Sequence, residues 1–176
     1  MYIAIYIIAA IVLLIVLLII IAPKKYEVNR SITINKDVGD VFQYLKHVKN
    51  QDYWSPWKER DPDMKQTFSG TDGTVGFVSA WESDHKQVGS GEQEIKNIVE
   101  NEKIETELRF LKPWKSVSQA YIKVADEGNN NTKVTWGFYG DSKPPMNIMM
   151  LFMNMDKAVG KDFEEGLAKL KTILEN

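Results

Sequence analysis

The chain contains no cysteine and only two histidines. Without cysteine it can form neither a disulfide framework nor a thiolate metal site. His47 and His85 lie far apart in the sequence, and their spacing matches no metal-binding motif such as HExxH. These absences give no basis for a metal centre, a cysteine nucleophile or a cofactor, and we expect none of them.

A large excess of basic residues is also missing. The counts of Lys+Arg 22 and Asp+Glu 24 give a net charge of -2, so no broad positive field attracts nucleic acid. The glycines between residues 70 and 76 lack the Lys-Ser/Thr pair of a P-loop and are expected in a hairpin turn. Glu92, Glu94, Glu105 and Glu107 lie opposite the apolar positions of their segments, which predicts a solvated strand face. The sequence therefore offers no convincing catalytic residue.

One long hydrophobic run opens the chain. The segment 2–22 carries no charge, and as a helix it would be roughly 31 Å long, about the thickness of the hydrocarbon core of a bilayer. A cleaved signal peptide is the alternative, but no basic residue precedes the run and Pro23 follows it directly. We expect a retained membrane anchor at 2–22 and a linker at 23–25. Lys24 and Lys25 then favour a cytoplasmic location for the rest of the chain.

Residues 26–176 have the pattern of one α+β domain. Val28, Ile32 and Ile34 alternate with polar residues as in a half-buried strand, and Asp37 is positioned to cap a short helix. Breaker-rich turns separate six further strand-like runs. These runs are 64–69, 75–81, 86–99, 103–111, 116–124 and 133–139.

The last segment, from Pro145 to the end, is predicted to be one long helix. Its second half carries an apolar stripe that includes Phe163, Leu167 and Leu170. Strands joined by short turns pair antiparallel, and a sheet of about seven such strands needs one face covered. The helix is the only predicted element long enough to cover it.

Six stretches carry a resemblance to a known family. They are VNRSITINKDVGDVFQYLKHV, WSPW, TDGTVGFVSAW with GSGEQEI, TKVTWGFYG and DFEEGLAKLK. Together they resemble the SRPBCC superfamily of START-like and pathogenesis-related-allergen-like proteins, in its bacterial polyketide cyclase/dehydrase-like branch. The resemblance implies a helix-grip fold, a curved antiparallel sheet wrapped around the C-terminal helix with an apolar cavity between them. It also implies binding of lipids or other hydrophobic molecules, although a fold alone does not determine chemistry.

Candidate ligand-binding residues follow from aromatic residues near the expected cavity and from polar residues on apolar strand phases. Large aromatics ordinarily fill cores, and an inward polar residue can instead mark a bulge or a rim. A ligand-filled or water-filled cavity would satisfy both groups, because burial of an unpaired polar group is costly. Arg30 also falls on an inward phase, where a rim position is the plainer explanation. The candidates on the sheet and short helices are Trp54, Trp57, Ser79, Trp81, Gln93, Thr106 and Trp136.

The methionine-rich stretch PPMNIMMLFMNM supplies the remaining candidates. As a helix it would be apolar all round, so the sheet could cover only part of it. We expect Met149, Phe152 and Met153 to face the cavity, and Met150 and Leu151 to face the membrane or a partner as a gate for lipid entry. An ordinary core helix is the alternative.

The sequence therefore predicts membrane-tethered, non-catalytic binding of a hydrophobic small molecule or lipid. Two other classes stay open at this stage. A cyclase- or hydrolase-type enzyme would need a buried acid–base pair, and a protein-interaction module would need an exposed apolar patch such as the methionine-rich stretch.

Overall fold

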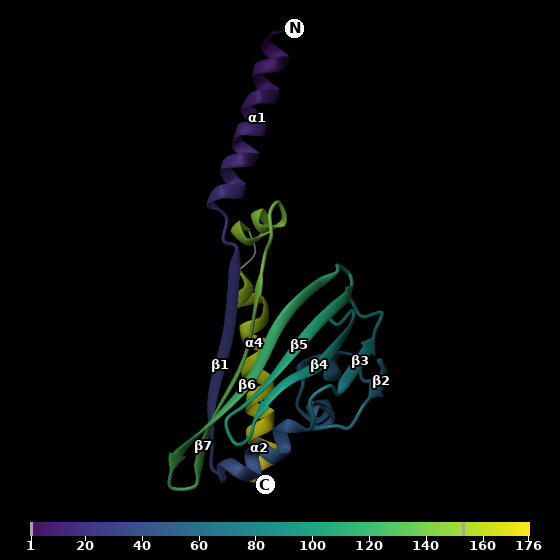
Figure 1. The fold of residues 1–176 in the computed structure, drawn as a ribbon, viewed down its shortest axis with the longest axis vertical. Helices are drawn as coiled ribbons and strands as arrows, with labels where there is room; N and C mark the ends of the chain where they lie inside the picture. The colour runs from purple at the N-terminus through teal and green to yellow at the C-terminus, as the bar shows by residue number, and fades with distance from the viewer. Residues whose placement is uncertain (1, 153) are drawn as a thin grey trace.

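The computed structural model describes residues 2–152 and 154–176. Helix α1 (Tyr2–Ile21) projects away from the rest of the chain, as Figure 1 shows, and none of its described residues is buried. Its length and apolar composition are those of a membrane span, and a signal sequence would pass the same test.

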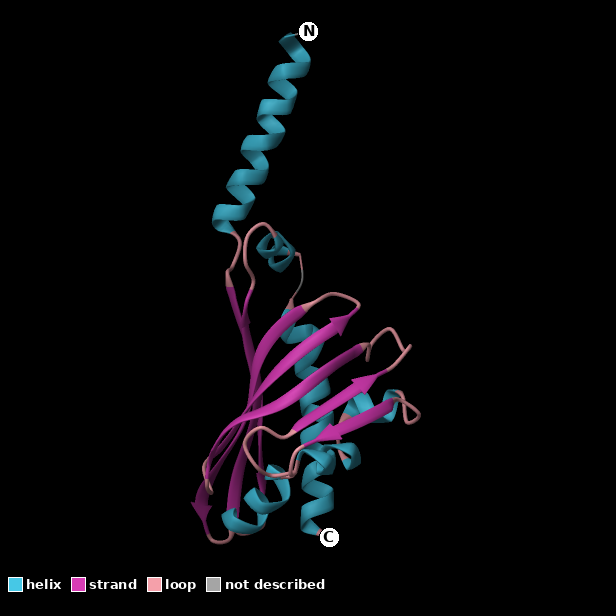
Figure 2. Cartoon of the chain, turned by 45° about the vertical axis from the view of Figure 1, so that its right-hand side comes forward, coloured by secondary structure: helices cyan, strands magenta, loops and turns pink. Residues whose placement is uncertain are grey.

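The sheet has seven antiparallel strands in the order β1-β7-β6-β5-β4-β3-β2. Its strong curvature, visible in Figure 2, leaves a concave face that points toward the C-terminal helix. The predicted α+β helix-grip fold is confirmed. The strands are β1 (Lys25–Ile34), β2 (Lys65–Ser69), β3 (Val78–Glu82), β4 (Ser90–Val99), β5 (Lys103–Lys112), β6 (Ser116–Gly128) and β7 (Asn131–Asp141).

Two strands are shorter than predicted. Strand β3 begins at Val78 and not at position 75, because Gly73 and Gly76 adopt positive φ angles of 81° and 89° that break the extended backbone. Strand β4 begins at Ser90 and not at position 86, because residues 83–89 form a turn closed by backbone bonds from Val88 and Gly89 to His85.

Three short helices connect β1 to β2. They are α2 (Val38–Lys46), η1 (Val48–Tyr53) and α3 (Pro56–Arg60). Asp37 caps α2 as predicted, and its side chain accepts a 2.8 Å hydrogen bond from the amide of Gly39. Pro56 sits in the first turn of α3, where its missing amide proton costs no helical bond.

The prediction of one continuous helix from Pro145 to the end is wrong. The chain forms a 3-10 helix, η2 (Met146–Leu151), and then a separate helix, α4 (Met155–Glu175). The side chain of Asn154 accepts a 3.0 Å hydrogen bond from the amide of Lys157, so it begins α4 as an N-cap. Only α4 lies along the concave face of the sheet, whereas η2 sits beside the end of α1 (Figure 1).

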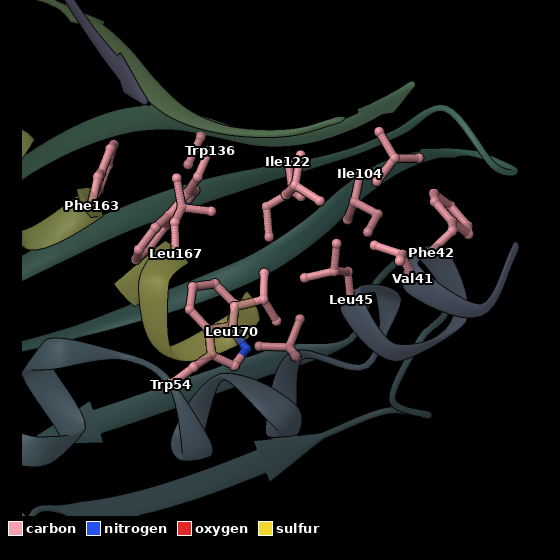
Figure 3. Packing of buried hydrophobic residues seen from close by; sticks show 14 of the residues in the cluster. Val41, Phe42, Leu45, Trp54, Ile104, Ile122, Trp136, Phe163, Leu167 and Leu170 are labelled. Carbon is pink, nitrogen blue, oxygen red and sulfur yellow. The ribbon is translucent and has the colours of Figure 1, made fainter. Parts of the chain in front are cut away.

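The core lies between the sheet, α4 and α2. Figure 3 shows Leu167 and Leu170 of α4 pointing toward Ile122 and Trp136 of the sheet, while Trp54 closes the layer from below. The interior of the domain is therefore packed solid at the α2 end, and any cavity must lie toward the other end of α4.

Arg30 fixes α4 to the edge strand β1. Its guanidinium pairs with Asp156 at 2.8 Å and with Glu164 at 2.5 Å. A Cβ atom at Gly160 would collide with this guanidinium, so a side chain there would force Arg30 to shift. Arg30 thus lies at a rim, paired with carboxylates, and it does not line the cavity described next.

Candidate ligand cavity

A cavity of about 340 Å³ lies between the concave face of the sheet and the first half of α4. Aromatic and aliphatic side chains form most of its wall, and amide, hydroxyl and two charged side chains form the remainder. The apolar wall includes Tyr26, Val48, Trp57, Met64, Trp81, Leu108, Phe110, Trp136, Phe138, Met155, Val159 and Phe163. Such a hollow suits an apolar or amphiphilic molecule.

Five of the predicted residues line this cavity. They are Trp57, Ser79, Trp81, Gln93 and Trp136. The two strand tryptophans and the two polar residues come from strands β3, β4 and β7, whose alternation turns these positions toward α4. Their part in ligand binding stays a prediction.

The aromatic residues form a layered wall near the middle of α4. The rings of Trp136 and Phe163 stack with centroids 4.2 Å apart, and Trp57 meets Trp136 edge-on at 5.6 Å. Aromatic pairs of this kind hold their rings in fixed orientations. This wall is therefore a rigid boundary of the cavity.

Trp54 and Thr106 lie behind the wall and not on it. Trp54 is 1% exposed and packs edge-on against Trp136 at 4.8 Å. Thr106 is also buried, and its hydroxyl accepts a 3.3 Å hydrogen bond from the side-chain amide of Gln93. Both residues support neighbours that line the cavity.

The expectation that Met149 and Phe152 face the cavity is not met. Their exposed fractions are 42% and 80%, and neither residue lines the cavity. The reason is the break before α4, which places η2 beyond the end of the sheet. Met153, the third of these candidates, lies outside the described residues. Met155, Val159 and Phe163 supply the helical side of the wall instead.

Sequence reasoning missed the end of the cavity that is nearest to α1. Tyr26 lines it, and the Tyr26 and Ser118 hydroxyls are hydrogen-bonded at 2.7 Å. A side chain at Gly140, between them on β7, would collide with the ring of Tyr26. Tyr26 shares its strand phase with Val28, so alternation could have indicated that it points inward.

The charged residues cluster at the opposite end of the cavity. Among the described residues, Asp52 and Lys58 are the only charged ones on its wall. The side-chain amide of Gln66 donates a 2.8 Å hydrogen bond to Asp52, and the amine of Lys58 donates one of 2.8 Å to the carbonyl of Pro62. We call this end, formed by Gln51, Asp52, Lys58, Gln66 and Gln87, the polar rim.

The strand carboxylates lie on the other face of the sheet. Arg109 contacts Glu92 at 2.9 Å, Glu94 at 2.6 Å and Glu107 at 2.8 Å. Hydrogen bonds from the Arg109 guanidinium hold the pKa of Glu94 and of Glu107 below the ordinary value. These carboxylates are therefore paired outside the cavity. Within the described residues, no group of three or more His, Cys, Asp or Glu side chains could hold a metal ion.

Comparison with known proteins shows the family to which the chain belongs. The profile of a family described as "Polyketide cyclase / dehydrase and lipid transport" matches residues 25–175. The chain belongs to this family. That membership confirms the resemblance noted in the sequence, and it is consistent with binding of a hydrophobic molecule. No curated protein sequence matches the chain significantly.

Solved structures of this polyketide cyclase-like fold are similar in shape but distant in sequence. Truncated norcoclaurine synthase from Thalictrum flavum is 10% identical with a TM-score of 0.62, over 89% of this chain and 98% of that one. The Aha1 dimer from Colwellia psychrerythraea is 14% identical with a TM-score of 0.58, over 85% and 96%. Mll3558 from Rhizobium loti is 15% identical with a TM-score of 0.59, over 84% and 96%. At these identities the likeness shows the fold alone.

Proposed function

We propose that this family member binds a hydrophobic small molecule or lipid in its cavity without catalysing a reaction, and that α1 tethers it to a membrane. The observation that carries the proposal is the apolar cavity of about 340 Å³ between the sheet and α4. Its size falls at the lower end of small-molecule sites, and its wall has the apolar majority typical of them.

The distribution of polarity along the cavity favours an amphiphile. The polar rim provides amide groups, one carboxylate and one amine, whereas the opposite end is closed by Tyr26, Phe138 and Met155. A ligand with a polar head at the rim and an apolar tail toward Tyr26 would place its polar group beside the polar side chains of the rim and its tail against the apolar wall.

The contact between η2 and α1 supports a retained anchor over a cleaved signal peptide. Asn147 is fully buried, and its side-chain amide donates hydrogen bonds to the carbonyls of Ile19 at 2.8 Å and Ala22 at 3.2 Å. Removal of residues 1–22 would take away both acceptors and expose this buried amide. This contact therefore supports retention of α1.

Native mass spectrometry of the full chain, released from detergent, tests ligand binding. We expect a co-purifying lipid or lipid-like molecule bound to the protein. Leu108 lies on the cavity wall, so Leu108→Trp should fill the middle of the cavity and lower the bound fraction roughly tenfold. Val117→Trp, at an exposed position of the same sheet, is the matched control and should retain the ligand.

Melting curves of both variants show whether the fold is intact. If the purified protein carries no bound lipid and binds none from a lipid extract, the proposal is overturned. Equal retention by Leu108→Trp and Val117→Trp, with both folded, would show that the bound molecule lies elsewhere.

A further inference from the structure

A second hollow lies beside the end of α1. Its volume is about 390 Å³, and we call it the crevice. It is formed where the linker, the start of β1 and the end of η2 meet. Its lining residues are Pro23, Lys25, Tyr26, Met150, Leu151, Phe152, Asn154 and Met155.

The crevice and the cavity share two lining residues, Tyr26 and Met155. The two hollows are therefore adjacent, and Tyr26 and Met155 border both of them. Tyr26 is held there by its 2.7 Å hydrogen bond with Ser118 and by contact with the ring of Phe138, 5.4 Å away. Met155 is the first residue of α4 and has an unbranched side chain that changes shape easily.

The crevice faces the place where α1 would leave a bilayer. The side chain of Asn147 in η2 is hydrogen-bonded to the carbonyls of Ile19 and Ala22 at the end of α1. Figures 1 and 2 show η2 beside that end of the helix. Apolar side chains of η2 and its C-cap point outward here, with exposed fractions of 58% for Met146, 42% for Met149 and 80% for Phe152. In water this exposure is unfavourable, whereas at a bilayer surface it is favourable.

The charged residues at this end of the domain also suit contact with a bilayer surface. The linker contributes Lys24 and Lys25, and the loop before η2 contributes Lys143. No acidic residue occurs in 22–25 or in 142–152. Basic residues beside an apolar surface attract anionic lipid headgroups.

We propose that Tyr26 and Met155 form a gate through which the acyl chain of a bilayer lipid passes from the crevice into the cavity. The inference rests on the proposed function and names the ligand class as a membrane lipid. The acyl chain enters past Met155, and the hydrogen bond between Tyr26 and Ser118 closes the wall behind it.

Lipid exchange in vesicles tests the gate. The full chain is reconstituted in dioleoyl phosphatidylcholine containing phosphatidylglycerol, and the outer lipid is replaced by its deuterated form. Samples are solubilised over time, and native mass spectrometry gives the labelled fraction of the protein-bound lipid. Met155→Trp should slow exchange of the bound lipid roughly tenfold, because a larger side chain at the gate raises the barrier to passage.

Two further variants sharpen the result. Tyr26→Phe removes the hydrogen bond with Ser118 but keeps the ring, so it should speed exchange several-fold. Val117→Trp is the matched control, because Val117 is an exposed residue of the sheet that lines neither the cavity nor the crevice. It should leave the exchange rate unchanged.

The outcomes separate the two proposals. Wild-type exchange in Met155→Trp, with lipid still bound, would overturn the gate and place entry elsewhere, while cavity binding would stand. Absence of any bound lipid in the wild-type chain would overturn the proposed function itself. Equal exchange rates in all four proteins, with lipid bound, would also overturn the gate.

Discussion

The side chain of Asn147 caps the C-terminal end of α1 by donating a 3.2 Å hydrogen bond to the carbonyl of Ala22. The last carbonyls of a helix have no partner within the helix, and near an apolar layer an unpaired carbonyl is costly. The same amide also donates to Ile19 at 2.8 Å. The domain is therefore joined to α1 at a second point besides the linker.

Asn147→Ala should free η2 from α1. Each lost hydrogen bond is worth about 0.5–1.5 kcal/mol, so amide hydrogen exchange should rise markedly in η2 and the last turn of α1. Amides of the central strands should keep their protection. Met146→Ala, at an exposed neighbouring position, is the control. Unchanged exchange in Asn147→Ala would mean that the cap does not hold the two elements together.

The tip of the β5–β6 hairpin should touch the membrane surface. It lies at the end of the domain nearest α1, and Trp114 there is 59% exposed between Lys112 and Lys115. Tryptophan and lysine both favour the interface. Since the chain has no cysteine, Trp114→Cys can be labelled alone with an environment-sensitive dye. We expect blue-shifted emission in phosphatidylglycerol-containing vesicles, and none for Lys133→Cys in the β6–β7 region at the far end.

The Lys133→Cys variant, left unlabelled, also tests the topology of the chain in the membrane. By the positive-inside tendency, Lys24 and Lys25 predict that the domain faces the cytoplasm. A membrane-impermeant maleimide should therefore react with this cysteine in inverted vesicles and not in intact cells. Labelling of intact cells would reverse the proposed orientation, and release of the full chain by alkaline carbonate would contradict the anchor.

Gly160→Ala should destabilise the domain, although alanine usually stabilises a helix by about 0.5–1 kcal/mol relative to glycine. The added methyl group would displace the Arg30 guanidinium from its carboxylate partners. In an Arg30→Met background, the same substitution should become neutral or stabilising. Thermal melts of the four proteins form a double-mutant cycle. Additive effects would show that Gly160 is not required by Arg30.

Arg109→Met should lower the melting temperature at pH 7 and have a smaller effect in acid. Hydrogen bonds from Arg109 lower the pKa of Glu94 and of Glu107 below the ordinary value of 4.5. Its contribution is therefore complete above pH 4.5 and is lost as the pH falls through the lower folded-state values. Because these pairs are partly exposed, we expect a decrease of only a few degrees. Lys112→Met, which breaks a 3.4 Å pair between 62% exposed side chains, should change the melting temperature less.

The sheet could be predicted because apolar and polar residues alternate along each strand, a pattern that can be read within a few neighbouring residues. In β5, Ile104 and Thr106 are buried whereas Glu105 and Glu107 are partly exposed, as a period of two requires. The same alternation places Ser79, Trp81 and Gln93 on the cavity wall. Breaker-rich turns then fix the antiparallel order without long-range information.

The residues that the C-terminal segment contributes to the cavity wall could not be predicted, because they depend on where one helix ends and the next begins. Asn154 lies within the stretch predicted as one helix, but its side chain caps α4, and Met149 and Phe152 lie outside the cavity. Alternation along β1 can indicate that Tyr26 points inward, but room for its ring requires the missing side chain of Gly140 on another strand. That contact joins residues distant in the sequence, so no periodicity reports it.

The path of β1 has a mechanical consequence. The strand starts at Lys25, directly after the linker, runs away from α1 in Figure 1, and pairs with β7 from Lys25↔Asp141 to Ile34↔Thr132. A force that pulls the domain from an anchored α1 would act along β1, perpendicular to its hydrogen bonds. The whole ladder would then carry the load in shear, and its bonds would not open one after another as in unzipping. The tether is thus joined to the sheet in the direction in which the sheet best resists extension.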